Sequence, residues 1–93
     1  MIELFDGYYI VIDEYNYAVA TKIKRKEKDG TYKDGWKFIS FHNSLADALI
    51  GFRRILVRKR LKNGCVSLTE ALTAVSEIDN KVETFIRAYT HKA

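Results

Sequence analysis

The topology of this chain follows from residues 17–42, which read YAVATKIKRKEKDGTYKDGWKFISFH. Apolar and polar side chains alternate through residues 17–25, and a second aromatic and β-branched run occupies residues 36–42. Both segments are therefore predicted to be strands. Asp29-Gly30 lies between them, and this dipeptide is typical of a two-residue type I′ turn, which needs positive φ at both central positions. The pattern predicts an antiparallel hairpin.

Two details of this hairpin stay open at the level of sequence. If the Asp-Gly dipeptide alone forms the turn, three pairs face each other across the hairpin: Ile23 and Trp36, Thr21 and Phe38, and Val19 and Ser40. Gly35 is a candidate bulge, and a bulge there would shift the register by one residue. The alternative is a longer loop over residues 27–35.

A further strand is predicted upstream, over residues 8–12 with the sequence YYIVI, followed by a polar corner at residues 13–16. Downstream, a helix is predicted from Leu45 to about Lys62, with Asn43 or Ser44 as its N-cap. At about 100° per residue this helix has two apolar stripes, and both should be buried. The first stripe contains Leu45, Ala48, Leu49, Phe52, Ile55 and Leu56, and the second contains Ala46, Ile50, Val57 and Leu61.

A second helix is predicted to begin at the capping box Ser67-Leu68-Thr69-Glu70 and to run from Leu68 to about Tyr89. It has a length of roughly 33 Å and a single apolar stripe. The stripe contains Leu68, Ala71, Leu72, Val75, Ile78, Val82, Phe85, Ile86 and Tyr89. That length lets part of the stripe project beyond its own core, where it can pack either against a second copy, as a homodimer through the second helix, or against a partner. The predicted fold class is α+β, a three-stranded antiparallel β-meander followed by two α-helices (βββαα), with one layer of sheet against the helices. The chain is expected to be a single domain over residues 1–93.

The net charge of +4 is concentrated in one segment. Residues 44–64 contain six lysines and arginines against Asp47 alone, which is a net +5, whereas residues 1–43 are neutral and residues 65–93 carry −1. A localised basic patch indicates an anionic partner more strongly than the same charge spread evenly. On the helical wheel Arg53 and Arg60 fall between the apolar stripes.

The candidate partner-binding residues form three groups. A basic helix face can contact phosphates or carboxylates, although a solvated face paired with acids of the second helix is an equally good interpretation. A basic hairpin can enter a nucleic-acid groove, but edge lysines also prevent strand-to-strand aggregation. Tyrosines anchor protein interfaces and stack on bases. The residues are Arg53, Arg54, Arg58, Arg60 and Lys62 on the helix, Lys22, Lys24, Arg25 and Lys26 on the hairpin, and Tyr15 and Tyr32 among the tyrosines.

No reactive centre is predicted. His42, Cys65 and His91 are the only histidine and cysteine residues, and they are scattered along the chain rather than clustered at metal-ligand spacing. Glycine-rich phosphate-binding motifs do not occur. We therefore expect a protein that is not an enzyme and that uses no metal or cofactor. The single cysteine and the lack of a signal-peptide pattern at the N-terminus predict a reduced, cytoplasmic protein, and the apolar runs are too short for a membrane partner or span.

Residues 8–17, YYIVIDEYNY, and residues 41–49, FHNSLADAL, resemble small uncharacterised proteins encoded by phages and mobile elements of Gram-positive bacteria. The resemblance covers roughly the first half of the chain and implies a non-enzymatic accessory protein in the host bacterial cytosol. Some such proteins bind nucleic acid, and others disable host or defence proteins, as anti-CRISPR proteins do. The strand–strand–strand–helix order is also similar to sheet-reading DNA-binding domains of the AP2 and integrase N-terminal type. This chain lacks the dense run of sheet arginines found in those domains.

These observations favour a phage-type accessory protein that binds a host or defence protein, as an inhibitor or adaptor of the anti-CRISPR-like class. The alternative is a nucleic-acid-binding module that holds DNA or RNA with the basic first helix and the basic hairpin. The two hypotheses differ in where the charge lies. Unpaired arginines would favour nucleic acid, whereas arginines neutralised by acids of the second helix would favour a protein partner.

Overall fold

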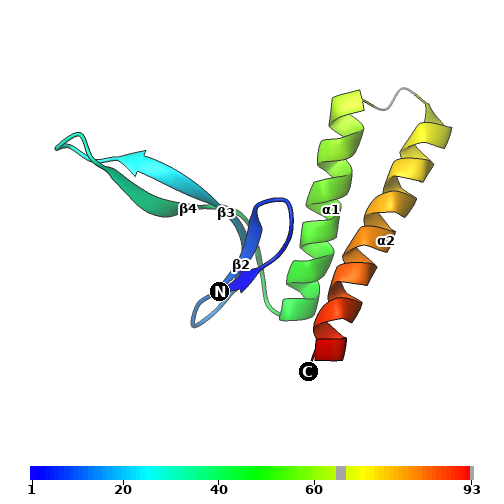
Figure 1. Ribbon diagram of the computed structural model, residues 1–93, viewed down its shortest axis with the longest axis horizontal. Coiled ribbons are helices and arrows are strands. Elements are labelled where there is room, and N and C mark those ends of the chain that lie inside the picture. Colours follow the sequence, from blue (N-terminus) through cyan, green and yellow to red (C-terminus); the bar gives the residue numbers. More distant parts are fainter. Residues whose placement is uncertain (65–66, 93) are drawn as a thin grey trace. The chain divides into compact units, whose positions relative to one another are not determined.

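The computed structural model describes residues 1–64 and 67–92, with side chains through residue 88 (Figure 1). The fold is α+β, as predicted: an antiparallel sheet in the order β1-β2-β3-β4, followed by two helices. Two compact units make up the chain, Met1–Gly51 and Phe52–Ala93. The elements are β1 (Ile2–Glu3), β2 (Tyr8–Ile12), β3 (Tyr17–Lys26), β4 (Tyr32–His42), α1 (Leu45–Gly64) and α2 (Leu68–Lys92).

A short first strand, β1, was not predicted from the sequence. It pairs with β2 through Ile2 opposite Ile10. The connecting turn contains Asp6 and Gly7, which both have positive φ (57° and 81°), and the Tyr8 N–H donates to the Phe5 carbonyl at 3.3 Å. Positive φ at both central residues is the geometry that a type I′ Asp-Gly turn requires.

The loop at Asp29-Gly30 differs from the predicted two-residue turn. Only Gly30 has positive φ, at 87°. Its N–H donates to the Glu27 carbonyl at 3.1 Å, and the Glu27 N–H donates to the Thr31 carbonyl at 2.7 Å. These bonds define a three-residue loop, Lys28–Gly30, in which a turn is followed by a left-handed glycine. The alternative of a loop over residues 27–35 is also wrong, because β4 begins at Tyr32.

The register of the β3–β4 hairpin changes once along its length. Val19 pairs with Ser40 as predicted, but Ala20 pairs with Phe38, so Ile39 is the extra residue of a bulge. Thr21 and Ile23 pair with Lys37 and Gly35, so their predicted pairing with Phe38 and Trp36 is wrong. Gly35 pairs regularly with Ile23, and the prediction of a bulge at Gly35 is wrong. The absent Cβ of Gly35 instead leaves room for the Arg25 side chain, whose Nε would lie 3.2 Å from a Cβ at that position.

The hairpin extends past the part of the sheet that β2 covers, as Figure 1 shows. Strand β2 pairs with β3 only along residues 17–21. Residues 22–26 of β3 therefore pair with β4 alone and form a two-stranded ribbon. Side chains on such a ribbon have solvent on both faces except where they contact one another.

One face of the sheet forms the core of the first unit. Tyr8, Ile10 and Val19 point to this face and are buried. The end of β4 contributes His42, whose Nε2 lies 2.8 Å from the Ser40 hydroxyl. The beginning of α1 comes close to this histidine, because a Cβ added at Gly51 would lie 2.5 Å from its ring.

Both helices begin as their capping residues predict. The Ser44 hydroxyl accepts a hydrogen bond from the Asp47 N–H at 3.1 Å, which decides between the two N-cap candidates for α1. The Ser67 hydroxyl accepts from the Glu70 N–H at 3.2 Å and caps α2. Among the described residues, no helix is apolar enough over a sufficient length to cross a bilayer.

The apolar stripes of the helices are only partly buried. In α1, Phe52 and Leu56 of the first predicted stripe are buried, and Val57 and Leu61 of the second stripe are half-buried. In α2, the buried residues are Ala74, Ile78 and Val82. Three residues of the predicted α2 stripe are exposed instead: Leu68, Leu72 and Ile86. The homodimer through α2 stays a prediction.

Candidate functional site

The face of the sheet opposite the buried Tyr8, Ile10 and Val19 is aromatic and partly exposed. Strand pairing brings its side chains together: Tyr9 and Phe38 flank Ala20, Phe41 is opposite Ala18, and Trp36 is opposite Lys22. We call this surface the aromatic face. It consists of Tyr9, Lys22, Trp36, Phe38 and Phe41.

Two ring contacts organise the aromatic face. The rings of Phe38 and Phe41 have their centroids 5.6 Å apart and are tilted by 33°. The rings of Tyr9 and Trp36 meet edge to face, with centroids 5.2 Å apart and an angle of 65°. Both separations lie in the range in which aromatic pairs attract one another. The phenylalanines nevertheless remain 47% and 59% exposed.

Small residues on the central strand make this arrangement possible. Ala18 and Ala20 occupy the aromatic face of β3 and are buried, at 2% and 0% exposure. Their methyl groups leave space above β3, so larger rings from β2 and β4 can cover it. The bulge at Ile39 keeps Phe38 and Phe41 on the same face even though they are three residues apart.

Lys22 gives the aromatic face its positive charge. Its Nζ lies 4.8 Å from the centroid of the Tyr9 ring and 5.9 Å from that of Trp36. Both distances are within the range of a cation–π interaction. The ammonium group thereby lies over one face of each ring.

The other candidate residues of the hairpin lie on the two-stranded ribbon. Lys24 and Lys26 alternate with Arg25, so the two lysines share the side of the aromatic face and the arginine points to the other side. The Arg25 guanidinium donates to the Trp36 carbonyl at 3.4 Å. The ribbon therefore does not present its four predicted cations on one face.

The two candidate tyrosines occupy different turns. Tyr15 is 79% exposed in the corner between β2 and β3, where its N–H donates to the Asp13 carboxylate at 2.8 Å. Tyr32 is 66% exposed at the start of β4, opposite Lys26. Neither side chain has a ring contact among the described residues.

Asp29 lies in the loop between β3 and β4, and its carboxyl is the one group in the described part of the chain whose pKa clearly departs from its usual value. The Asp29 carboxylate accepts hydrogen bonds from the Thr31 hydroxyl at 2.6 Å and the Thr31 N–H at 3.0 Å. Because both bonds favour the charged form, they hold the pKa of the Asp29 carboxyl below its usual value.

The five basic residues of α1 that were predicted as partner-binding residues divide into two sets in the second unit. Arg53 and Arg60 pair with acids of α2: Arg53 Nε lies 3.5 Å from Asp79 Oδ1, and Arg60 donates to the Glu77 carboxylate at 3.0 Å. The Arg53–Asp79 contact lacks hydrogen-bond geometry, since Asp79 Oδ1 is buried without a hydrogen-bond partner. The pairing of these two arginines with α2 agrees with the helical wheel, on which Arg53 and Arg60 lie between the apolar stripes and apart from the other basic residues.

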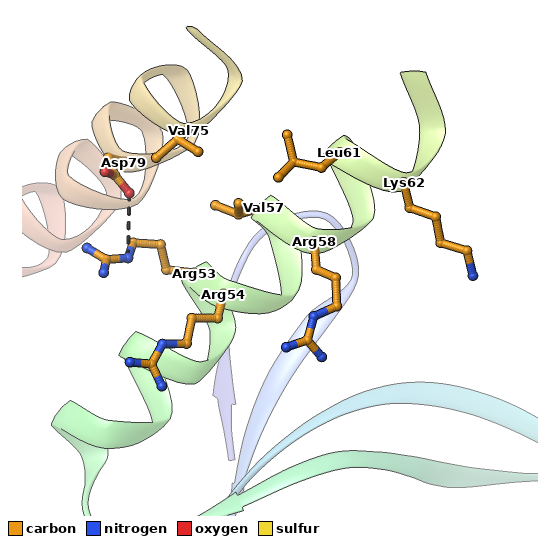
Figure 2. Close-up of a pocket in the computed structure, with 8 residues that line it drawn as sticks. All are labelled: Arg53, Arg54, Val57, Arg58, Leu61, Lys62, Val75 and Asp79. Atoms are coloured by element: carbon orange, nitrogen blue, oxygen red, sulfur yellow. Dashed lines mark ion pairs between the residues drawn. The ribbon is translucent and has the colours of Figure 1, made fainter. Parts of the chain in front are cut away.

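The second set consists of Arg54, Arg58 and Lys62, which have no ion pair or hydrogen bond with any described residue. Figure 2 shows all three directed away from α2, whereas Arg53 reaches across to Asp79. An open groove runs beside them. Its lining residues are Arg53, Arg54, Val57, Arg58, Leu61, Lys62, Val75 and Asp79.

Metal-ligating side chains are dispersed over the described residues. Three or more metal-ligating side chains do not come together within that part of the chain. The His42 ring contacts the Ser40 hydroxyl, but no carboxylate in the described residues orients its other nitrogen, and α1 approaches the ring at Gly51. Cys65 and the side chain of His91 lie outside the described residues.

The sequence analysis did not identify Trp36, Phe38 and Phe41 as candidate residues. One signal for them was present, because Ala18 and Ala20 alternate along β3 in positions where a buried strand usually carries larger side chains. No family model matches the chain, and the comparisons with curated proteins and with solved structures gave no match either.

Proposed function

We propose that this protein is a non-enzymatic, phage-type accessory protein that binds a host or defence protein through the aromatic face. The observation that carries this proposal is the exposed pair of Phe38 and Phe41 on one side of a sheet. A phenylalanine side chain has no polar group that can hydrogen-bond to water, so its exposure in the free protein is unfavourable. Covering the exposed half of one such ring contributes about 2 kcal/mol, so the pair supplies a hydrophobic centre for an interface.

The surroundings of the phenylalanines support a protein partner. Protein interfaces combine aromatic anchors at the centre with polar groups at the rim. Here Trp36 and Tyr9 adjoin the pair on the same face, and Lys22 adds a cation that also contacts the rings. The partner would therefore present an apolar patch with an acidic group near Lys22. The complex with this partner would form in the bacterial cytosol.

A nucleic-acid partner is less well supported. Stacking a base needs a free ring face, and Lys22 competes with a base for one face of Tyr9 and of Trp36. On α1, Arg53 and Arg60 are neutralised by acids of α2. Arg54, Arg58 and Lys62, which form no ion pair with any described residue, remain available for a phosphate backbone, so nucleic acid is an explicit outcome of the experiment below.

The experiment is affinity capture from an extract of the bacterial host, carried out with and without nuclease. The double variant Phe38→Ser/Phe41→Ser removes the hydrophobic pair. The matched control is Ile12→Ser, because Ile12 is 48% exposed on the opposite face of the same sheet. Circular dichroism checks that each variant is folded.

The proposal predicts a protein that is captured after nuclease treatment, retained by the control and lost with the double variant. Capture that depends on intact nucleic acid would instead support the nucleic-acid alternative. Equal capture by the wild type and the double variant would show that the aromatic face is not the interface.

A further inference from the structure

The open groove of the second unit combines an apolar floor with unpaired cations. Val57 and Leu61 of α1 and Val75 of α2 provide the apolar surface, and all three are half-buried. Arg54, Arg58 and Lys62 stand along one side (Figure 2). From this combination we infer that the groove binds an acidic amphipathic helix of a partner protein.

The spacing of the cations matches the carboxylates of a helix. Arg54, Arg58 and Lys62 follow one another at intervals of four residues, which is about 6 Å of rise per step along α1. Glutamates or aspartates spaced by four residues on a ligand helix repeat with the same rise. A ligand helix aligned with α1 can therefore pair one carboxylate with each cation.

The floor of the groove matches the apolar side of the same ligand. Val57 and Leu61 are also four residues apart, and Val75 faces them from α2. Helix-in-groove recognition uses apolar anchors at intervals of three and four residues. A ligand with leucines on one face and carboxylates beside them satisfies both the floor and the cationic side.

A nucleic-acid backbone fits this groove less well. A phosphate–sugar chain is polar and charged, so it gains little from contact with the aliphatic side chains of Val57, Leu61 and Val75. The Asp79 carboxylate also lines the groove, and its Oδ1 accepts no hydrogen bond from Arg53. The ion pair of Arg53 with Asp79 leaves this end of the groove without a net positive charge for a phosphate. A peptide can place an apolar residue or a hydrogen-bond donor at that end.

The test is a fluorescence-anisotropy titration of the intact chain with three labelled probes. One is a short peptide of glutamate, alanine and leucine with leucines every three and four residues. In the second, serines replace the leucines without changing the charge. The third is a single-stranded thymidine oligonucleotide. The variants are Arg54→Glu/Arg58→Glu and, with the same change in net charge, Lys28→Glu/Lys33→Glu in and beside the exposed hairpin loop.

We expect the leucine peptide to bind more tightly than the serine peptide. The helix variant should weaken this binding about tenfold or more, whereas the hairpin variant should change it by less than about threefold. Equal binding of both peptides, equal effects of both variants, or no peptide binding would overturn the inference. So would tighter binding of the oligonucleotide that the helix variant abolishes.

This groove is separate from the aromatic face, and its test does not depend on the function proposed for that face. The variant Phe38→Ser/Phe41→Ser should bind the leucine peptide as the wild type does. If that variant loses peptide binding, the peptide occupies the aromatic face and the assignment to the groove is wrong.

Discussion

Gly51 lies where the first turns of α1 approach the end of β4. Its missing Cβ leaves room for the His42 ring, which would otherwise be 2.5 Å away, and that ring is also held by Ser40. Alanine is normally favoured over glycine within a helix by about 1 kcal/mol. At this position the overlap with His42 acts in the opposite direction, because forced overpacking costs about 1–3 kcal/mol.

We therefore expect Gly51→Ala to lower the free energy of unfolding by about 1 kcal/mol, measured by urea denaturation. Gly64→Ala is the control, since a Cβ there meets nothing within 4 Å, and it should be neutral or slightly stabilising. In a His42→Ala background the glycine substitution should become stabilising. A stabilised Gly51→Ala single variant would show that His42 does not constrain α1.

Asp29 is a second residue whose surroundings lead to a prediction. Thr31 hydrogen bonds lower the pKa of its carboxyl in the folded loop, so the charged form is favoured by folding. The resulting stabilisation is fully present above the usual aspartate pKa near 4 and is lost as the pH falls through the lower, folded value.

The amide resonance of Thr31 reports the protonation of the Asp29 carboxyl in an NMR titration, because the Thr31 N–H donates to that carboxylate. Its shift should move with a midpoint below the usual aspartate value, and it should not titrate in Asp29→Asn. A midpoint for Asp29 at or above the usual aspartate value would contradict the observed hydrogen bonds.

At the scale of the elements, the ends of the helices follow from local chemistry. Ser44 caps α1 by accepting the Asp47 N–H, so Ser44→Ala should cost about 1 kcal/mol of stability while Ser44→Asp should be neutral. The same serine-to-alanine change at exposed Ser76, in the interior of α2, should instead stabilise by a few tenths of a kcal/mol. Urea denaturation of the three variants gives the change in the free energy of unfolding, and therefore its sign at Ser44 and at Ser76. Equal effects at Ser44 and Ser76 would mean that the cap contributes nothing.

The strands were predictable as elements, but their connections were not. Asp6-Gly7 and Asp29-Gly30 are identical dipeptides, yet only the first has positive φ at both residues. Loop length depends on the pairing of the whole flanking strands, and the bulge at Ile39 shifts that pairing by one residue. No local signal marks Ile39, because β-branched residues are typical of regular strands as well.

The candidate surfaces were predictable to different degrees. The division of the α1 cations could be read from the helical period, and the ion pairs of Arg53 and Arg60 agree with it. The aromatic face could not be read in the same way. Alternation assigns residues to two faces of a sheet but does not say which face is buried, and the bulge places Phe38 and Phe41 on one face despite their odd spacing.

At the scale of the whole molecule, the central claim is that the aromatic face recognises a protein. The chain contains a single tryptophan, and Trp36 lies on that face in contact with Tyr9. A chain labelled with 5-fluorotryptophan therefore gives one fluorine NMR resonance, which reports on this surface alone.

The most direct test is to follow that resonance while adding nuclease-treated host extract, and separately single-stranded DNA. The account predicts that the extract shifts or broadens the Trp36 signal of the wild type but not that of Phe38→Ser/Phe41→Ser, and that DNA leaves it unchanged. A Trp36 resonance that does not change when the extract is added, or one that changes with DNA instead, would show that this face does not recognise a protein.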